Sequence, residues 1–288
     1  MAEVTAEQMM GRAPVVGFVG LGNIGKPMAL RLAASDLALV VYDVAPEPLA
    51  ELAAAGAKVA DDVAGLARAA DVVCVMVRDD AQVRDVLDQV LAAAPGPRTV
   101  VVHSTVAPQT PAALADLAAP HGVRLLDAPV SGGAMGAADG TLAILLGGTD
   151  EAFEAARPAL EVMGSKVVHA GPVGAGTRFK LARNLMHFVA FTAATEAQRL
   201  AEAAGLSLRD LGEVVRHTDA ITGGPGAIMH RDTTAPIEPG DFWHGVMSHV
   251  VALGEKDLGF ALDLADELGV DVPLARRARA DLAKGLGL

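Results

Sequence analysis

The chain has 288 residues, enough for two domains, and 52% of them are apolar, which is typical of globular proteins rather than disordered chains. Its formal net charge of −12 argues against a nucleic-acid binder or a protein of anionic membrane surfaces, because both need a basic face. The single cysteine, Cys74, excludes an internal disulfide framework and fits a reducing, cytoplasmic location, and no apolar run is long enough to predict a membrane span.

The first element along the chain is a short tail. Residues 1–13 contain Glu3 and Glu7 and lack the apolar segment of a signal peptide, so we expect a loose N-terminal tail.

From Val15 to about Gly176, short β-branched runs alternate with Ala- and Leu-rich stretches, as in βαβ units. Most of these runs are continuously apolar, which is typical of strands covered by helices on both faces. The sequence therefore predicts an α/β domain over residues 14–176, with a doubly wound parallel sheet of the Rossmann type. The predicted strands are Val15–Val19, Leu39–Tyr42, Val72–Val77, Val100–Val102, Val123–Leu126, Leu142–Leu146 and Val167–His169.

The pattern changes after Gly176. Residues Thr177–Ala204 contain no Gly or Pro and predict one helix on the order of 40 Å long. Residues 177–288 are therefore expected to form an all-helical domain for substrate binding and oligomerisation, joined to the sheet domain by this long helix. Further helices are expected at Leu208–His217, Val246–Leu253, Lys256–Leu268 and Leu274–Leu286, and a loop at Thr222–Gly240, which is rich in Gly and Pro.

A GxGxxG pattern directly follows the first predicted strand and opens a helix. Gly20 allows the tight turn, Gly22 lets the backbone approach a pyrophosphate, and Gly25 lets the helix pack close to the strand. The free N–H groups and the positive end of the helix dipole then favour an anion. The residues predicted to bind a dinucleotide here are Gly20, Leu21, Gly22, Asn23, Ile24 and Gly25.

Asp43 ends the second predicted strand, 23 residues beyond Gly20. A carboxylate at this place can accept hydrogen bonds from the ribose hydroxyls and repels a 2′-phosphate. No basic residue follows before Lys58. The cofactor is therefore expected to be NAD in preference to NADP.

Four stretches together resemble the β-hydroxyacid dehydrogenase family, which includes 3-hydroxyisobutyrate and tartronate semialdehyde dehydrogenases. They occur in the family's order and span nearly the whole chain. The set is therefore specific for the family, although each stretch alone is only modest evidence for it. The stretches are Gly20–Gly25, Asp127–Gly133 (DAPVSGG) with Gly136 and Gly140–Leu142 after it, Gly174–Asn184 (GAGTRFKLARN), and Lys256–Leu262 (KDLGFAL).

The resemblance implies site residues in these stretches. Ser131, Gly132 and Gly133 are small residues after a strand that expose backbone N–H groups beside a hydroxyl, and the resemblance implies that they hold a substrate carboxylate. Lys180 and Asn184 are four residues apart on one helix face. The resemblance implies that Lys180 is the general acid/base and that Asn184 orients it; a solvated helix face is the alternative.

Three further residues are predicted at the cofactor. Thr105 follows a strand end, where doubly wound sheets bind ligands, and the family has its Thr near the nicotinamide. Val77 ends another strand, and Lys256 is expected beside the nicotinamide or the substrate carboxylate. The chain departs from the family at His103, which replaces an acid, and at Arg78, where the family usually has Pro; we interpret His103 as a packed strand-end residue.

The sequence thus predicts an NAD-dependent oxidoreductase that interconverts a small β-hydroxy acid and its semialdehyde by hydride transfer, acting as a homodimer or homotetramer. No metal site is expected: His244 and His249 are five residues apart, so they do not share one helix face. The alternatives are an imine reductase, which typically lacks the lysine at Lys180, a 6-phosphogluconate-type dehydrogenase, and a non-catalytic dinucleotide-binding protein.

Overall fold

The computed structural model describes residues 13–288, so the expected tail, except for Ala13, lies outside the described residues. The chain divides into two compact units, the first ending at Ala182 and the second comprising Arg183–Leu288. The division falls inside the long helix α9 (Ala175–Ala203), which was predicted from the absence of Gly and Pro.

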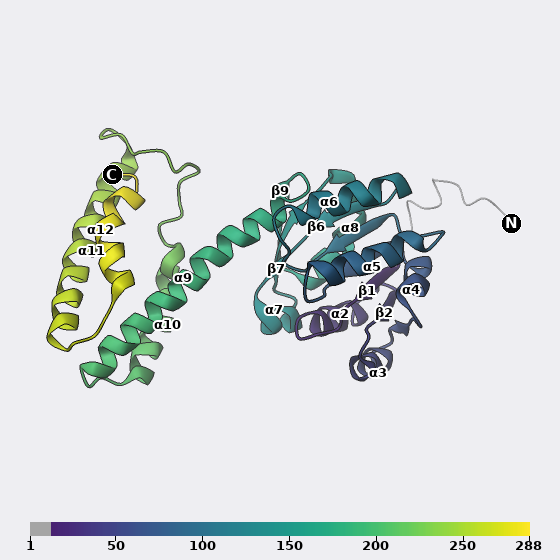
Figure 1. Cartoon of the computed structure of the whole chain (residues 1–288), viewed down its shortest axis with the longest axis horizontal. Coiled ribbons are helices and arrows are strands. Elements are labelled where there is room, and N and C mark those ends of the chain that lie inside the picture. The colour runs from purple at the N-terminus through teal and green to yellow at the C-terminus, as the bar shows by residue number, and fades with distance from the viewer. Residues whose placement is uncertain (1–12) are drawn as a thin grey trace. The chain divides into compact units, whose positions relative to one another are not determined.

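The first unit is built on a nine-stranded sheet with the order β3-β2-β1-β4-β5-β6-β8-β7, in which β9 also pairs with β8 (Figure 1). Strands β1 to β6 are mutually parallel, as predicted. The strands are β1 (Val16–Val19), β2 (Leu39–Tyr42), β3 (Lys58–Val59), β4 (Val72–Val75), β5 (Thr99–Val102), β6 (Arg124–Asp127), β7 (Val130–Ser131), β8 (Ala143–Gly147) and β9 (Lys166–Gly171).

The prediction of a parallel sheet is wrong at one side, where β8 pairs antiparallel with both β6 and β7. The chain returns from β7 to β8 through the single short helix α7 (Gly133–Asp139), and so short a connection reverses the strand instead of crossing over to a parallel one. Strands β3 and β7 have two residues each, too few for an apolar run to reveal them.

Helices cover both faces of this sheet, which explains the continuous apolar runs of its strands. In β1, Val16 and Phe18 belong to one buried cluster and Val19 to the other, as the period-2 alternation of a strand requires. The first cluster involves α2 (Gly25–Ala33), α3 (Pro46–Ala54), α7 and α8 (Asp150–Met163), and the second involves α4 (Val63–Ala69), α5 (Asp80–Ala92) and α6 (Thr110–Ala118).

The second unit contains the rest of α9 followed by α10 (Leu208–Thr222), α11 (Phe242–Glu267) and α12 (Pro273–Gly285). Two predicted helices, Val246–Leu253 and Lys256–Leu268, are wrong as separate elements, because α11 runs through both. Gly254 lies between them without breaking the helix; a Cβ there would lie 2.7 Å from the side chain of Leu282, so the glycine lets α12 pack closely. None of the helices in residues 13–288 is long and apolar enough to cross a membrane.

Candidate active site

The glycine turn joins the end of β1 to the start of α2, as the sequence predicts. Gly20 has a φ of +95°, and a Cβ there would lie 2.1 Å from the carbonyl oxygen of Met76. A Cβ on Gly25 would lie 2.0 Å from the carbonyl oxygen of Gly20, so the helix can start this close to the turn only with glycine. Gly22 has no atom within 4 Å of the place of its missing Cβ, so the turn presents bare backbone to open space.

Asp43 is fixed against this turn by its own carboxylate. Its Oδ2 accepts a hydrogen bond from the backbone N–H of Leu21 at 2.5 Å, and its Oδ1 accepts one from Ala45 at 2.8 Å. Leu21 therefore holds Asp43 through its backbone N–H, while its own side chain is buried. Each carboxylate oxygen has a second lone pair, so Asp43 can still accept hydrogen bonds from ribose hydroxyls.

A cavity of about 580 Å³ opens beside the turn. It is lined by Gly20, Gly22, Asn23, Ile24 and Gly25, by Asp43, and by Val77 after β4, all of which the sequence predicts as cofactor residues. Its volume lies in the range of small-molecule sites. Open glycine backbone, a helix N-terminus and an anchored carboxylate together fit the pyrophosphate and the ribose of a dinucleotide.

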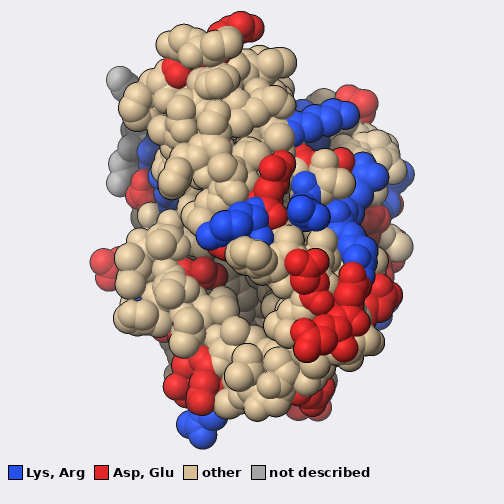
Figure 2. All heavy atoms as spheres, turned by 90° about the vertical axis from the view of Figure 1, so that its left-hand side faces the viewer, with Lys and Arg blue, Asp and Glu red and all other residues tan. Residues whose placement is uncertain are grey.

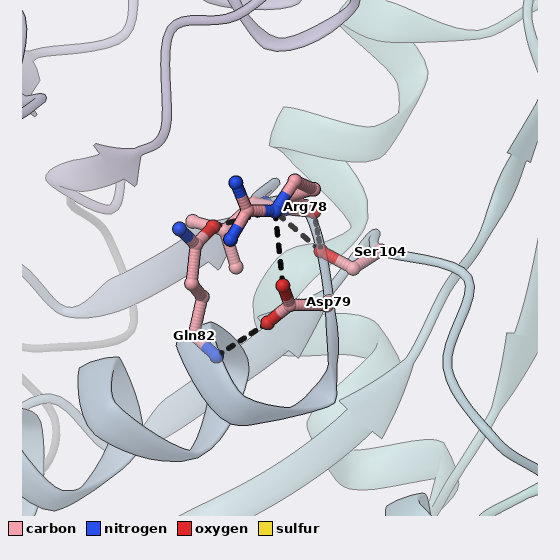
Figure 3. Close-up of polar contacts among 5 residues, drawn as sticks. Arg78, Asp79, Gln82 and Ser104 are labelled. Carbon is pink, nitrogen blue, oxygen red and sulfur yellow. Dashed lines mark hydrogen bonds and ion pairs between the residues drawn. The ribbon is translucent and has the colours of Figure 1, made fainter.

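Hydrogen bonds of Ser104 join the segments that follow β4 and β5. Its hydroxyl donates to the carbonyl oxygen of Val77 at 2.8 Å and accepts from the backbone N–H of Val77 at 2.9 Å (Figure 3). Thr105, predicted near the nicotinamide, is the next residue and is exposed. The Ser104 bridge was not predicted, because it joins residues 27 positions apart.

The turn from β4 into α5 is closed by a hydrogen-bonded cap. Asp79 accepts from the backbone N–H of Gln82, and the Gln82 side chain accepts from the backbone N–H of Arg78 at 3.0 Å. The N–H of Gln82, followed by the side chain of Arg78, holds the pKa of Asp79 below its usual range. An Asp followed three residues later by Gln is a pattern from which this cap could have been predicted.

The predicted carboxylate-binding residues lie where β7 passes into α7. Ser131 is half-buried, and Gly132 and Gly133 are exposed. Both glycines have positive φ, +137° and +66°, so the loop takes a course that larger residues rarely adopt.

Lys180 and Asn184 lie on α9, one helical turn apart. Lys180 is buried, with 8% of its surface exposed, so it is not part of a solvated helix face. Asn184 is half-buried, and its side-chain oxygen lies 3.4 Å from an Nη group of Arg183. Burial distinguishes Lys180 from the other lysines of the described residues, none of which is buried.

Asp127 connects the start of α9 to the strand that precedes the Ser131 loop. This fully buried residue ends β6, and its two carboxylate oxygens accept hydrogen bonds of 2.6 Å from the backbone N–H groups of Gly174 and Thr177. Burial raises the pKa of Asp127, and the two backbone donors oppose that shift. Asp127 belongs to the DAPVSGG stretch, and the sequence predicts no role for its side chain.

His103 is fully buried and packs against Phe18, as expected of a strand-end residue. Its Nδ1–H donates to the carbonyl oxygen of Ala128 at 2.8 Å. Burial lowers the pKa of His103 to about 4, so the ring is neutral at physiological pH.

Lys256 belongs to α11 of the second unit. Its side chain is about half exposed and forms an ion pair of 3.1 Å with Asp257. Its role beside a nicotinamide or a carboxylate stays a prediction.

Comparison with known proteins identifies the family of both parts of the chain. Residues 15–171 match the NAD-binding domain of 6-phosphogluconate dehydrogenase, and residues 174–285 match the NAD-binding family model of NADP-dependent 3-hydroxyisobutyrate dehydrogenase. The chain belongs to the β-hydroxyacid dehydrogenase family. It is therefore an NAD(P)-dependent dehydrogenase.

Three relatives show how far the similarity extends. An uncharacterised oxidoreductase of Mycobacterium tuberculosis is 49% identical over 278 residues, which cover 96% of this chain and 94% of the relative. A 3-hydroxyisobutyrate dehydrogenase of Pseudomonas aeruginosa is 35% identical over 278 residues, covering 92% of this chain and 89% of the relative. A crystal structure from Mycobacterium avium, described as an oxidoreductase, has a TM-score of 0.92 at 47% identity and covers 95% of this chain and 99% of that one.

Imine reductases share the fold. One from a Pseudomonas species has a TM-score of 0.76 at 22% identity over 96% of both chains. At this identity the likeness concerns the fold alone.

Proposed function

We propose that this β-hydroxyacid dehydrogenase interconverts a small β-hydroxy acid and its semialdehyde, with Lys180 as general acid/base and NAD as the preferred cofactor. The observation that carries the proposal is the burial of Lys180 one turn after Thr177, whose backbone is bound by Asp127 at the end of β6. The chain continues from Asp127 into Ser131 within four residues, so one short segment connects the expected carboxylate loop to the helix of the expected base.

The residues of the glycine turn, with Asp43 and Val77, would hold the dinucleotide, which supplies the hydride acceptor when bound. In the oxidation, Lys180 takes the proton of the substrate hydroxyl at its Nζ, and in the reduction it returns that proton. A buried base is shielded from bulk water, which would otherwise compete for this proton.

The substrate carboxylate is held by Ser131, Gly132 and Gly133. Exposed backbone N–H groups and a hydroxyl are suitable donors for a carboxylate. Asn184, one turn beyond Lys180, contributes an amide that can bind the substrate or orient the lysine. Fixing the hydroxyl-bearing carbon in this way supplies much of the expected rate enhancement.

The preference for NAD rests on how Asp43 is anchored. Hydrogen bonds from Leu21 and Ala45 fix its carboxylate, so it cannot swing away from a 2′-phosphate. The neighbouring residue in the cavity, Val44, offers no positive charge that would compensate.

The test is a panel of short hydroxy acids with NAD, including 3-hydroxyisobutyrate, L-serine and glycerate, comparing the wild type with Lys180→Met. We expect turnover of at least one acid and a loss of roughly 100- to 10,000-fold in kcat for the variant, the range for a lost general acid/base. Binding of NADH should stay unchanged, and Lys58→Met, at an exposed strand-edge position, serves as the control. Comparable turnover by Lys180→Met would remove Lys180 from its role, and turnover of a cyclic imine without any acid would favour an imine reductase.

We also propose that the chain pairs with a second copy of itself through its helical unit. Leu185, Phe188 and Phe191 on α9 each expose more than half of their surface, although they are large and apolar. The buried cluster of this unit consists of only three residues, Leu262, Ala265 and Val272. In Figure 2, broad areas of the surface that faces the reader carry no Lys, Arg, Asp or Glu. Exposed large apolar side chains such as Leu185, Phe188 and Phe191 are typical of an interface between subunits.

A further inference from the structure

The cavity beside the glycine turn has a single Lys or Arg among its lining residues in the described part of the chain, Arg78. The other charged lining residues are the acids Asp43 and Asp85. A dinucleotide carries two negative charges on its pyrophosphate, and a helix N-terminus supplies only about half a positive charge. The cavity therefore has one full positive charge to offer this anion.

The Nε and the backbone N–H of Arg78 are both hydrogen-bonded. Its Nε donates to Asp79 at 3.0 Å, and its backbone N–H donates to the side chain of Gln82. The backbone N–H and the carbonyl oxygen of the preceding residue, Val77, are both hydrogen-bonded to the hydroxyl of Ser104. Figure 3 shows Arg78, Asp79 and Gln82 gathered at this turn, with Ser104 beside it.

The outer edge of the guanidinium is available to a ligand. The side chain of Arg78 is 79% exposed, and its two Nη groups make no hydrogen bond within residues 13–288. A guanidinium presents a fork of two Nη groups beyond its Nε, which matches two oxygens of a phosphate. Asp79 can keep the Nε while this fork binds an anion.

The sheet order places Arg78 beside the glycine turn. Strand β1 lies between β2 and β4, so the turn after β1 has Asp43 on one side and the residues after β4 on the other. Gly20 packs against the two residues that precede Arg78, because a Cβ on Gly20 would lie 2.1 Å from the carbonyl oxygen of Met76 and 3.0 Å from the side chain of Val77. Asp43, which is proposed to bind the ribose, and Arg78 thus follow the two strands on opposite sides of the glycine turn.

We propose that Arg78 binds the cofactor pyrophosphate through its two Nη groups while Asp79 holds its Nε. The proposal rests on the NAD(P)-binding domain alone and is independent of which acid is oxidised.

The test measures ligand binding, with no catalytic step. Dissociation constants for ADP-ribose and for adenosine are measured by calorimetry, at low and high salt, for the wild type, Arg78→Gln and Arg78→Lys. Gln keeps the backbone N–H that donates to Gln82. The matched control is Arg84→Gln, because Arg84 is exposed on α5, the helix that follows Arg78, pairs with Asp88 and does not line the cavity.

We expect Arg78→Gln to weaken the binding of ADP-ribose at least about tenfold, because the charge-assisted hydrogen bonds of both Nη groups are lost, and to flatten its salt dependence. Arg78→Lys should keep the salt dependence but bind less tightly than the wild type, because it lacks the planar fork. Adenosine, which has no phosphate, should bind all four proteins equally.

Unchanged binding of ADP-ribose to Arg78→Gln, with thermal unfolding like that of the wild type, would overturn the proposal. Equal losses for adenosine and ADP-ribose would also overturn it, since Arg78 would then act on the adenosine part. Neither outcome bears on the hydroxy-acid reaction, so the two proposals fail separately.

Discussion

The carboxylate of Asp127 accepts a hydrogen bond from the backbone N–H of Thr177, fifty residues later in the sequence and one helical turn before Lys180. A second bond, from Gly174, occupies the other oxygen. The end of β6 and the start of α9 are thereby joined through a buried charge-assisted contact. Whatever displaces this contact also displaces the helix that carries the proposed base.

Replacing Asp127 by Ala is expected to reduce both stability and turnover. Each hydrogen bond to a buried charged group contributes about 1.5–3 kcal/mol, and the two donors would remain buried without a partner. We expect the free energy of unfolding to fall by about 3 kcal/mol. In denaturant titrations, Asp88→Ala, which removes an exposed acid paired with Arg84, should cost far less.

The variant Asp127→Asn distinguishes a role of this residue in positioning Lys180 from a role in folding. It keeps one oxygen acceptor, so the folded protein should persist, with kcat reduced about tenfold and NADH affinity unchanged because the glycine turn is intact. A kcat like that of the wild type would show that the contact stabilises the fold without positioning Lys180.

The parts of the site that could be predicted are those whose chemistry is local in sequence. The glycine turn needs particular residues at fixed spacing between a strand and a helix, and the strand after that helix leads directly into Asp43. The burial of Lys180 was not fixed by its apolar neighbours on the long helix, because Phe179 and Leu181 are themselves exposed. Neighbouring residues thus determine the cofactor turn almost completely.

The remainder depends on contacts between distant residues. Ser104 meets Val77 because β4 and β5 are adjacent in the folded sheet. Asp127 meets Thr177 because β6 and β9 both pair with β8, and α9 follows β9. The same holds for α11: the close packing of Gly254 against Leu282 belongs to tertiary structure. A sequence pattern indicates which residues are apolar, but it does not specify which residues far away in the sequence they contact.

Asp43→Asn is expected to weaken discrimination against NADP. Two unit charges 4 Å apart repel by about 1 kcal/mol even in bulk water, so removing the carboxylate should lower the ratio of the NADPH and NADH dissociation constants roughly tenfold. The asparagine oxygen can still accept from Leu21 or Ala45, which preserves part of the anchoring. Fluorescence titration measures both constants.

Asp85→Asn is the control for that titration, because Asp85 lines the same cavity from α5. Asp85→Asn should change the ratio of the NADPH and NADH dissociation constants less than Asp43→Asn does. An unchanged ratio in Asp43→Asn would contradict the assignment of Asp43 to the ribose.

His103 should make the protein sensitive to acid. Its pKa is about 4 in the folded protein, against 6.5 for an unperturbed histidine, so the unfolded chain binds the extra proton first as the pH falls. The folded state therefore loses stability between pH 6.5 and about 4, by about 3 kcal/mol in total, and loses no more from this group below that range.

The variant His103→Gln isolates this contribution. Its amide can donate to Ala128 but does not titrate, so its free energy of unfolding should decline less steeply than that of the wild type over this pH range. The exposed His121→Gln should keep the wild-type slope. Parallel curves for His103→Gln and the wild type would contradict the buried neutral state of His103.

Phe188→Glu is expected to break the association between copies. A carboxylate in the centre of an apolar contact must be desolvated without a partner, which costs several kcal/mol and outweighs the burial of neighbouring side chains. Light scattering should then report a lower molecular mass, while helix content stays unchanged because the residue is exposed in the single chain. Val59→Glu makes the same chemical change on strand β3 of the first unit and should leave the mass unaltered. If the wild type is itself monomeric, the exposed side chains of α9 have another role; if Phe188→Glu keeps the wild-type mass, the contact lies on a different face.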